Sequence, residues 1–401
     1  MNTAQHAITL PRLRLNKGAD RRLQSGHLWI YSNEIDNQVT PLRTFTPGQH
    51  ATVETQHGKV LGTAYLNPNS LICARLLTRG SAVFSAALLI ARLRTALQLR
   101  ERFFDAPFYR LVYGESDLLP GLVVDRFGAH LVVQLNTAGM DAMREMVVDA
   151  LTEVLQPESI LLRNDSGIRE LEGLPSEVVV AHGEPPETIE LTENGVRFRA
   201  PLRTGQKTGW FYDQRPNRAW LQAISRDRSV LDVFSYVGSF GVQAGVFGAK
   251  SVSCVDASEQ ALLQARENAE LNNFRGDFHT LHGDAFDQLR ALRADNRKFD
   301  IVIVDPPAFV KKKKDLPKGA AAYRRINEIA IELLNPDGLL IASSCSMHLP
   351  TEELVEALRS GAQRTERHVQ LLAEGMQGID HPVHPAIPET RYLKALLARV
   401  I

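Results

Sequence analysis

The stretch Leu231-Asp-Val-Phe-Ser-Tyr-Val-Gly-Ser-Phe-Gly241 has the form of a buried strand, a tight turn and the start of a helix. Gly238 allows the backbone to turn sharply and to approach a ligand closely. The stretch lacks the GxGxxG pattern of dinucleotide-binding proteins, and no pyrophosphate cradle is evident. It therefore indicates an α/β domain whose first strand leads into a ligand-binding turn of another kind.

Downstream of this turn, apolar strands alternate with helical stretches. Strands are expected at 230–234, 251–255, 278–282, 301–304 and 339–342, with helices near 239–248, 258–272, 284–294 and 319–335. The terminal run 391–401 is expected to add a last, antiparallel strand. Such alternation predicts an α/β fold, a doubly wound Rossmann-like sheet with helices on both faces.

The first half of the chain contains two smaller modules. Residues 1–78 hold short β-prone runs separated by turn signals, which is typical of a small β-barrel. Residues 79–190 combine a helix over 82–103 with several strands and a helix near 139–155, which predicts a small α+β unit. A chain of 401 residues is too long for one ordinary domain. We therefore expect three domains, 1–78, 79–190 and 191–401.

The composition is that of a globular protein, with 44% hydrophobic and 23% charged residues. The formal net charge is zero, so no global basic field attracts nucleic acid. The three cysteines are odd in number and far apart, and no Cys/His cluster has metal-ligand spacing. Neither a secretory h-region nor a membrane-spanning apolar run is seen. We expect a cytoplasmic protein with no disulfide framework, no metal site and no membrane partner.

Four carboxylates stand at the ends of successive strands: Asp232, Asp256, Asp284 and Asp305. In open α/β sheets, ligands bind at this edge. The second carboxylate could accept the ribose hydroxyls of an adenosine-containing ligand, and the third its adenine amino group. An Asp after a strand is more often a helix N-cap, but four in order favour the ligand.

This series resembles the class I S-adenosylmethionine-dependent methyltransferase fold, and the resemblance implies that cofactor. The residues expected to hold it are Gln214, Asp232, Phe234, Ser235, Tyr236, Gly238, Asp256, Ala257, Asp284, Ala285 and Asp305.

Two further stretches carry reactive groups at the same edge, Asp305-Pro-Pro-Ala-Phe309 and Ser343-Ser-Cys-Ser346. The first matches a motif of methyltransferases that act on nucleobases. Pro306 and Pro307 fix the backbone and leave carbonyls free to accept hydrogen bonds, and Phe309 could stack on a flipped base. The alternative reading of this motif is a rigid loop with a core phenylalanine.

Cys345 differs from Cys73 and Cys254, which have the pattern of small buried apolar residues. A thiolate at position 345 could add to C6 of a pyrimidine and so activate C5, which is otherwise a poor nucleophile. Asp305 could then steady N3 of the ring. A free thiol is only about 3% ionised at pH 7, so a cation or hydrogen-bond donor must assist. The sequence identifies neither that group nor the base that removes the C5 proton.

The whole chain resembles the bacterial large-subunit ribosomal RNA cytosine-C5 methyltransferase family, of the type that modifies cytosine 1962 of 23S RNA. The resemblance rests on four stretches, 17–31, 110–126, 205–215 and the pair 305–309 with 344–346. It implies a PUA domain, a linker domain and a catalytic domain, with 23S ribosomal RNA or a large-subunit precursor as partner. It also implies a single nucleophilic Cys, at position 345, which forms 5-methylcytosine. Ala308 departs from the Lys or Thr that is more usual before the Phe.

Local basic clusters are candidate RNA contacts. The amino-terminal cluster holds Lys17, Arg21 and Arg22, and a second run, Lys311–Lys314, follows the Pro-Pro loop. Lysines such as Lys311 and Lys312 would supply phosphate affinity without reading sequence. The plainer interpretation is a solvated charged surface.

Two other functions stay open from the sequence. One is a methyltransferase of the same fold that acts on guanine N7 or N2 and needs no cysteine. The other is a non-catalytic RNA-binding or ribosome assembly factor. The exact nucleotide, the form of the RNA substrate and a homodimeric state are also left open.

Overall fold

The computed structural model describes residues 10–401. By their contacts these divide into two compact units. The first comprises residues 10–187, Pro201–Trp210 and Asp380–Thr390, and the second comprises Thr188–Ala200, Phe211–Ile379 and Arg391–Ile401. Each unit is described by itself. The expected boundary at residue 190 stays a prediction, although the contacts group 201–210 and 380–390 with the first unit.

The first unit begins with a five-stranded sheet of order β1-β3-β4-β5-β2. An isolated bridge between Leu15 and Ile35 links segments outside the strands. Apolar side chains such as Leu13, Val53 and Ile30 fill its interior. The strands are β1 (Arg12–Arg14), β2 (Trp29–Ile30), β3 (His50–Glu54), β4 (Val60–Leu66) and β5 (Ala74–Leu76), with helix α1 at Asp20–Gln24.

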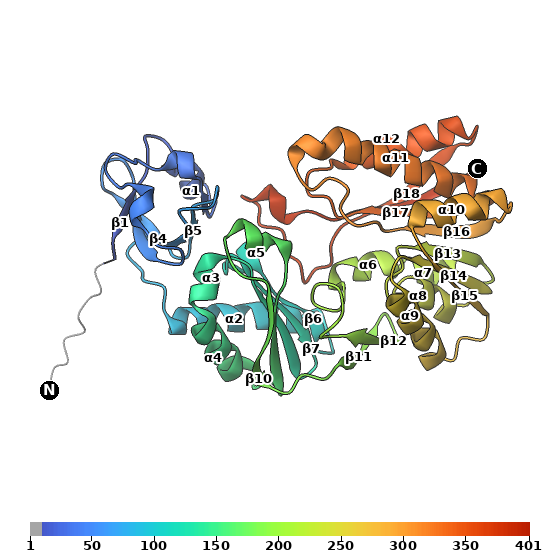
Figure 1. The fold of residues 1–401 in the computed structure, drawn as a ribbon, viewed down its shortest axis with the longest axis horizontal. Coiled ribbons are helices and arrows are strands. Elements are labelled where there is room, and N and C mark those ends of the chain that lie inside the picture. The colour runs from blue at the N-terminus through green and yellow to red at the C-terminus, as the bar shows by residue number, and fades with distance from the viewer. Residues whose placement is uncertain (1–9) are drawn as a thin grey trace. The chain divides into compact units, whose positions relative to one another are not determined.

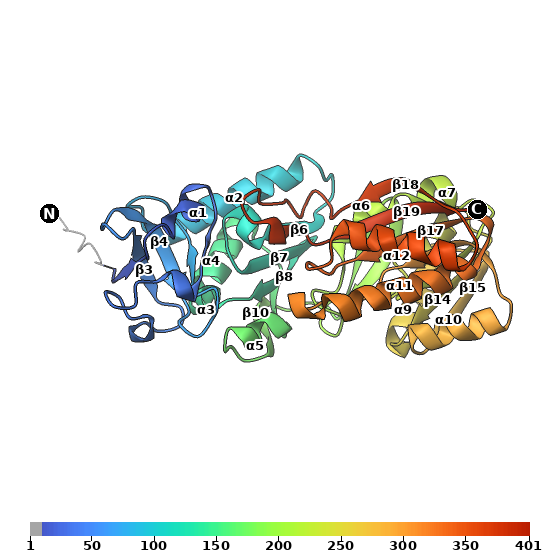
Figure 2. The ribbon, with the colours of Figure 1, turned by 90° about the horizontal axis from the view of Figure 1, so that it is seen from above.

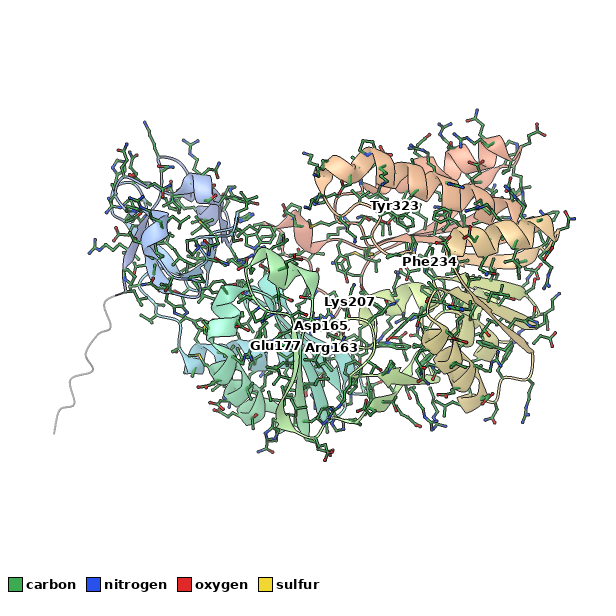
Figure 3. All side chains as sticks on the ribbon, in the orientation of Figure 1. Arg163, Asp165, Glu177, Lys207, Phe234 and Tyr323 are labelled. Carbon is green, nitrogen blue, oxygen red and sulfur yellow. The ribbon has the colours of Figure 1, made fainter. Side chains whose placement is uncertain are left out.

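A second five-stranded sheet, of order β10-β9-β8-β7-β6, completes the first unit. Helices α2 and α4 contact each other over a core with Leu93 and Val147. Buried Arg163 in β9 forms an ion pair with Asp165, just after that strand, with Nη2 and Oδ2 2.8 Å apart (Figure 3). The elements are α2 (Ala86–Glu101), β6 (Phe108–Tyr113), β7 (Leu122–Phe127), β8 (His130–Leu135), α3 (Ala138–Ala142), α4 (Arg144–Leu155), β9 (Ser159–Asn164), α5 (Gly167–Leu171) and β10 (Glu177–Gly183).

The second unit contains a seven-stranded sheet of order β15-β14-β13-β16-β17-β19-β18 (Figure 1). The first five strands in this order are parallel, and β19 is antiparallel to both of its neighbours. The strands are β13 (Ser229–Val233), β14 (Ser251–Asp256), β15 (Asp277–His282), β16 (Phe299–Val304), β17 (Leu334–Ser344), β18 (Val369–Gly375) and β19 (Lys394–Val400). A two-stranded sheet of β11 (Thr188–Glu193) and β12 (Val196–Pro201) precedes them.

Helices cover both faces of this sheet because successive strand residues point to opposite sides. In β13, Leu231 and Val233 belong to one core, while Val230, the residue before Leu231, belongs to the other. The helices on the first face are α10 (Ala285–Ala294), α11 (Leu316–Glu332) and α12 (Thr351–Arg364), and those on the second are α7 (Leu221–Ile224), α8 (Gly241–Val246) and α9 (Glu259–Leu271). The short helix α6 (Arg215–Arg218) leads into α7.

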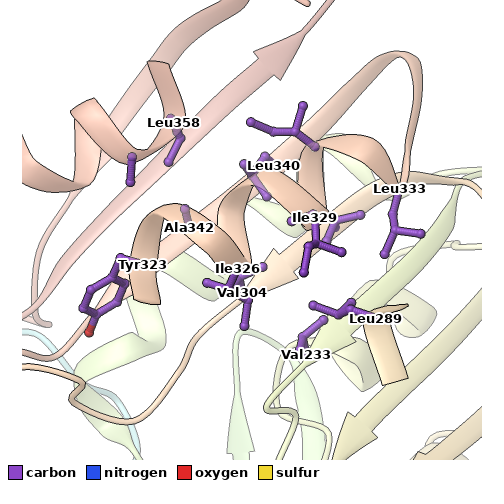
Figure 4. Packing of buried hydrophobic residues seen from close by; sticks show 14 of the residues in the cluster. Val233, Leu289, Val304, Tyr323, Ile326, Ile329, Leu333, Leu340, Ala342 and Leu358 are labelled. Carbon is purple, nitrogen blue, oxygen red and sulfur yellow. The ribbon is translucent and has the colours of Figure 1, made fainter. Parts of the chain in front are cut away.

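Helix α11 is the main cover of the first face. Its residues Tyr323, Ile326 and Ile329 share one apolar cluster with Val304 and Leu340 of the central strands (Figure 4). Helix α12 runs beside α11, and the two are in contact along their length (Figure 2). This packing holds the carboxyl ends of β16 and β17 in register.

The doubly wound sheet, its five parallel strands and the antiparallel last strand confirm the sequence prediction. The single helix expected near 139–155 is two helices, because the backbone breaks at Met143 between α3 and α4. The elements that were not predicted are helices α1, α5, α6, α7 and α12 and strands β1, β6, β11, β12 and β18. Among residues 10–401, no helix is both long enough and apolar enough to cross a membrane.

Candidate active site

The strand order reverses between β13 and β16, where ligands of open α/β sheets bind. The loop after β13 takes up unusual backbone angles there: φ is +64° at Phe234, +50° at Tyr236 and +77° at Gly238. Two non-glycine residues at positive φ within three positions represent stored strain, which is typical of binding sites. A Cβ on Gly238 would lie 2.9 Å from the Cβ of Ala265, so only glycine fits. Backbone hydrogen bonds from Phe234 N (2.9 Å) and Ser235 N (3.1 Å) to Val255 O hold the loop against β14.

Asp232 is fully buried beneath this loop. Its Oδ2 accepts a hydrogen bond from Gly241 N at 2.8 Å, while its Oδ1 has no partner among the described residues. Burial raises the pKa of Asp232 to about 7, and the charges of Asp305 and Asp256 add to this, against the hydrogen bond from Gly241. A buried oxygen without a partner beside a strained loop fits a site that receives a polar ligand.

The next two carboxylates also accept backbone hydrogen bonds. Asp256 accepts from Tyr236 N (2.8 Å) and Ser258 N (2.9 Å), so it fastens the strained loop. Asp284 accepts from Asp287 N at 3.2 Å and caps α10, which is the alternative reading of an Asp after a strand. Each carboxylate oxygen keeps a second acceptor position, so neither contact prevents binding of a ribose hydroxyl or an adenine amino group.

Asp305 directly follows β16 and is oriented by two successive side-chain amides. Gln214 donates from Nε2 to Asp305 Oδ1 at 2.8 Å, and Asn217 donates from Nδ2 to Gln214 Oε1 at 2.7 Å. The buried Asn217 thus aligns the glutamine, and the glutamine aligns the carboxylate. Gln214 therefore contacts a predicted catalytic residue as well as being a predicted cofactor residue. Asn217 was not identified from the sequence, because a polar residue in a short helix carries no signal of its own.

The two reactive stretches meet at adjoining strand ends. Parallel pairing of β16 with β17 sets Val304 opposite Ala342. Half-buried Cys345 lies next to the Pro-Pro loop, with its Sγ 3.8 Å from the Pro306 carbonyl oxygen. The carbonyl that Pro306 was expected to leave free thus accepts from the thiol. Pro306 is buried, whereas Pro307 is exposed.

A tyrosine that the sequence did not single out ties these loops together. Ser344 Oγ donates to Tyr323 Oη at 2.8 Å, and Tyr323 Oη and Ser346 Oγ are 2.9 Å apart. Val310 N also donates to Ser346 Oγ at 3.1 Å. The two serines that flank Cys345 are therefore anchored to one buried hydroxyl. A tyrosine on an amphipathic helix reads as a core aromatic, so only the fold reveals this role.

Phe309 lies in an aromatic cluster. Its ring centre is 4.9 Å from that of Tyr323 and 6.4 Å from that of Phe234, and Figure 3 marks both of these neighbours. The ring of Phe309 is half-buried rather than free on the surface.

Three further residues expected to hold the cofactor differ in burial. Ala257, at the start of the segment after β14, is exposed, whereas Ala285, after β15, is buried. Ser235 is buried in the strained loop.

The predicted RNA contacts differ from one another. Lys17, Arg21 and the run Lys311–Lys314 are exposed. Arg22 instead donates to both carboxylate oxygens of Glu34, at 2.9 and 2.8 Å, and its guanidinium lies 4.8 Å from the Tyr31 ring centre. Arg22 thus has a structural role in the first unit, and its contact with RNA stays a prediction.

The raised pKa of Asp232 predicts a pH-dependent stability. In the unfolded chain this carboxyl ionises near its ordinary value, whereas in the folded unit it keeps its proton up to about pH 7. The folded state then binds more protons, so stability falls as pH rises between these values. We expect the unfolding free energy of Asp232→Asn, relative to wild type, to increase by about 2 kcal/mol from about pH 5 to about pH 7.5.

The free energy of unfolding of the second unit is measured by urea denaturation, monitored through hydrogen exchange in peptides from β13. Asp300→Asn is the matched control: burial opposes ionisation of Asp300, but hydrogen bonds from Ser229 and Asn335 leave its pKa lowered. The effect of that variant should be constant over the same interval. An Asp232→Asn effect that is equal at both pH values would contradict the prediction.

Comparisons with known proteins agree with this geometry. Residues 174–399 match the family described as S-adenosylmethionine-dependent methyltransferase, and residues 13–79 match the PUA-like domain. Among solved structures, a putative methyltransferase complexed with SAH is similar in fold, with a TM-score of 0.84 and 22% identity over 97% of this chain and 100% of that one. A putative SAM-dependent methyltransferase from Streptococcus mutans has a TM-score of 0.82 at 21% identity, with the same coverage.

Curated relatives are more similar in sequence. Ribosomal RNA large subunit methyltransferase I of Erwinia tasmaniensis is 37% identical over 396 residues, which cover 97% of this chain and 99% of that protein. The proteins of the same name from Aliivibrio fischeri and Yersinia pestis are each 36% identical, over 96% and 97% of this chain and 98% and 99% of their own lengths. The S-adenosylmethionine-dependent methyltransferase fold and the PUA-like domain predicted from the sequence are confirmed. The chain belongs to the ribosomal RNA large subunit methyltransferase I family.

Proposed function

We propose that this S-adenosylmethionine-dependent methyltransferase forms 5-methylcytosine in 23S ribosomal RNA, with Cys345 as nucleophile. The observation that carries the proposal is the meeting of Cys345 with the Asp305–Pro306 turn, where Sγ lies 3.8 Å from the Pro306 carbonyl oxygen. A guanine-N7 or N2 enzyme of the same fold would need the carboxylate and the Pro-Pro turn but no thiol at that point. The names of the curated relatives support ribosomal RNA as the substrate class.

The residues of the site suit a cofactor with an adenosine group. Asp232 offers an unpartnered buried oxygen, and Asp256 and Asp284 keep free acceptor positions at the next two strand ends. These three carboxylates, with the loop Phe234–Gly238, would hold S-adenosylmethionine. When bound, S-adenosylmethionine supplies the methyl group for C5 of the cytosine.

The roles of the chain's own groups follow from electron flow in the ring. The Cys345 sulfur forms a bond to C6, and the C5–C6 π pair moves toward C5 and the N3 side, where Asp305 shares a proton. After C5 has taken the methyl group, the C5 proton passes to a solvent base. The C5–H pair then re-forms the double bond, the C6–S bond breaks, and its pair returns to the sulfur.

RNA binding would use both units. The exposed Lys17 and Arg21 of the PUA-like domain and the exposed Lys311 and Lys312 would contact phosphates. Such contacts set affinity and its dependence on salt, whereas base identity is read in the pocket. A ribosomal RNA substrate supports a cytoplasmic location for the enzyme.

The test is a methyl-transfer assay on unmodified large-subunit RNA, followed by mass mapping of the product. We expect 5-methylcytosine at one position and no methylguanine. Methylguanine without 5-methylcytosine would overturn the proposal in favour of the guanine enzyme. Binding of RNA with no methyl transfer at all would favour the assembly factor.

A further inference from the structure

The proposed function requires Cys345 to react as a thiolate, yet a free thiol is mostly protonated at neutral pH. In the structure the thiol faces the Pro306 carbonyl oxygen, an acceptor that favours the S–H form. This carbonyl does not stabilise the thiolate, whereas a nearby cation would. Lys394, the first residue of β19, is placed to supply it.

Strand pairing brings Lys394 to the nucleophile. β19 runs antiparallel to β17, and Lys394 is the register partner of Ser344, the residue before Cys345. The lysine Nζ donates to the carbonyl oxygen of Ser346, the residue after Cys345, at 2.6 Å. Lys394 thus contacts the chain on both sides of the thiol, from a strand 49 positions further along.

Two of the three N–H donors of the Lys394 ammonium group are used in hydrogen bonds to backbone carbonyls. Its other hydrogen bond goes to the Tyr392 carbonyl oxygen at 2.9 Å. An ammonium carries three N–H donors, so these two bonds leave one without a partner among the described residues. The side chain is buried, with 8% exposure, and it loses most of its hydration. A desolvated cation with a free donor attracts a neighbouring anion more strongly than a solvated lysine does.

The electrostatics couple the two groups. Burial lowers the pKa of Lys394 to about 8, while interaction with Cys345 raises it and Arg391 lowers it. At neutral pH the amine is therefore still mostly an ammonium. Because linkage is reciprocal, a Cys345 thiolate that stabilises the Lys394 ammonium is itself stabilised by that ammonium to the same extent.

The other titratable groups around Lys394 do not replace it. A hollow of about 400 Å³ borders the lysine and is lined also by His348, Glu352, Glu374 and Arg391. Buried Tyr323 is neutral, because burial raises its pKa above the ordinary value. The charged side chains that line the hollow are of both signs and partly cancel. The buried ammonium of Lys394 is therefore the group that favours a negative charge on the Cys345 sulfur.

We infer that Lys394 is a positioning residue that holds the Cys345 loop by the Ser346 carbonyl and increases the fraction of the Cys345 sulfur that is thiolate at neutral pH. This deepens the proposed function and rests on it, because only a cysteine nucleophile needs such a partner. No proton is taken up or released by Lys394 in the reaction. Its charge lowers the free energy of the thiolate before attack on C6 and again when the C6–S bond breaks.

The test is the pH dependence of iodoacetamide alkylation of Cys345 in the full-length protein without RNA, read by mass spectrometry of its peptide. Cys73 and Cys254 do not interfere, because burial raises the pKa of Cys73 to about 12 and that of Cys254 well above its ordinary value. In wild type we expect the midpoint to lie about one pH unit below the free-thiol value of about 8.5. In Lys394→Met it should rise by about one unit, so that the rate at pH 7 falls about tenfold.

Lys394→Arg keeps the charge and should retain the wild-type midpoint. Lys298→Met is the matched control, since Lys298 also donates to a backbone carbonyl, that of Glu332, on the surface of the same unit. Its midpoint should be unchanged. Loss of methyl transfer in Lys394→Met with an unchanged midpoint would overturn the inference and leave a purely structural role.

Two outcomes distinguish a failure of this inference from a folding defect of the variant and from a failure of the proposed function. If Lys394→Met does not fold, a wild-type midpoint at or above about 8.5 still overturns the inference. If methyl transfer to cytosine is absent but the midpoint shifts as expected, the lysine–thiol pair stands and the proposed function falls.

Discussion

Cys345→Ala should reduce 5-methylcytosine formation by about 1,000-fold or more, while binding of S-adenosylmethionine stays within a few-fold of wild type. Without the sulfur, no bond forms at C6, and C5 stays too weak a nucleophile to accept the methyl group. The fold should tolerate the change, because Cys345 is half-buried and its contact with the Pro306 carbonyl oxygen is long. Single-turnover methylation of unmodified RNA and calorimetry with the cofactor measure the two effects.

Cys73→Ala is the matched control. Cys73 is a buried thiol in the core of the amino-terminal sheet, so its loss should cost stability but not the chemical step. RNA that contains 5-fluorocytidine gives a second readout, because the fluorine at C5 cannot leave as the proton does. Wild type should form a denaturation-resistant adduct with this RNA and Cys345→Ala should not. Methylation by the alanine variant at a wild-type rate would exclude a covalent step.

The parallel core of the second unit was predictable because its strands are buried on both faces. Ile301–Val304 and Leu339–Ala342 are unbroken apolar runs, and such runs between helical stretches have few alternatives to a doubly wound sheet. The same reasoning placed Asp305 and Cys345 at one edge, which the pairing of β16 with β17 confirms. Adjacent parallel strands end together whatever the intervening helix contains.

What escaped prediction depends on contacts between distant segments. Strand β18 has exposed residues on both sides, such as Leu371 and Leu372, so its sequence lacks a clear alternation. Lys394 looked like an ordinary charged residue in the last strand. Its role depends on the antiparallel register with Ser344, which no local pattern reveals.

The carboxylates at the strand ends show that the role of a single residue cannot be predicted from its local sequence context alone. Asp284 caps α10, as a lone Asp after a strand usually does, whereas Asp232 is buried with one oxygen unpartnered. Both residues share the same sequence context, a strand end followed by a helix. Burial and strain at Phe234 and Tyr236, which come from the packed fold, separate the two cases.

Asp305→Asn should lower kcat by about 100-fold or more, with a smaller effect on binding of S-adenosylmethionine. The substitution keeps the size of the side chain and an oxygen that can accept from Gln214 Nε2, now 2.8 Å from Asp305 Oδ1. An amide, however, cannot share a proton with N3 as electron density enters the ring, so the loss falls on the chemical step. Single-turnover rates at saturating cofactor measure it.

Asp300→Asn is the control from the opposite end of the same strand. Asp300 accepts hydrogen bonds from Ser229 N and Oγ, each at 2.8 Å, and holds β13 to β16 away from the reactive edge. Its amide variant should lose some stability but keep kcat, because it changes charge on the strand without touching the site. If Asp305→Asn retained kcat within threefold, the carboxylate would serve the cofactor or the fold alone. Proton sharing at N3 would then have to come from the solvent or the RNA, and the assignment of Asp305 as a catalytic residue would be wrong.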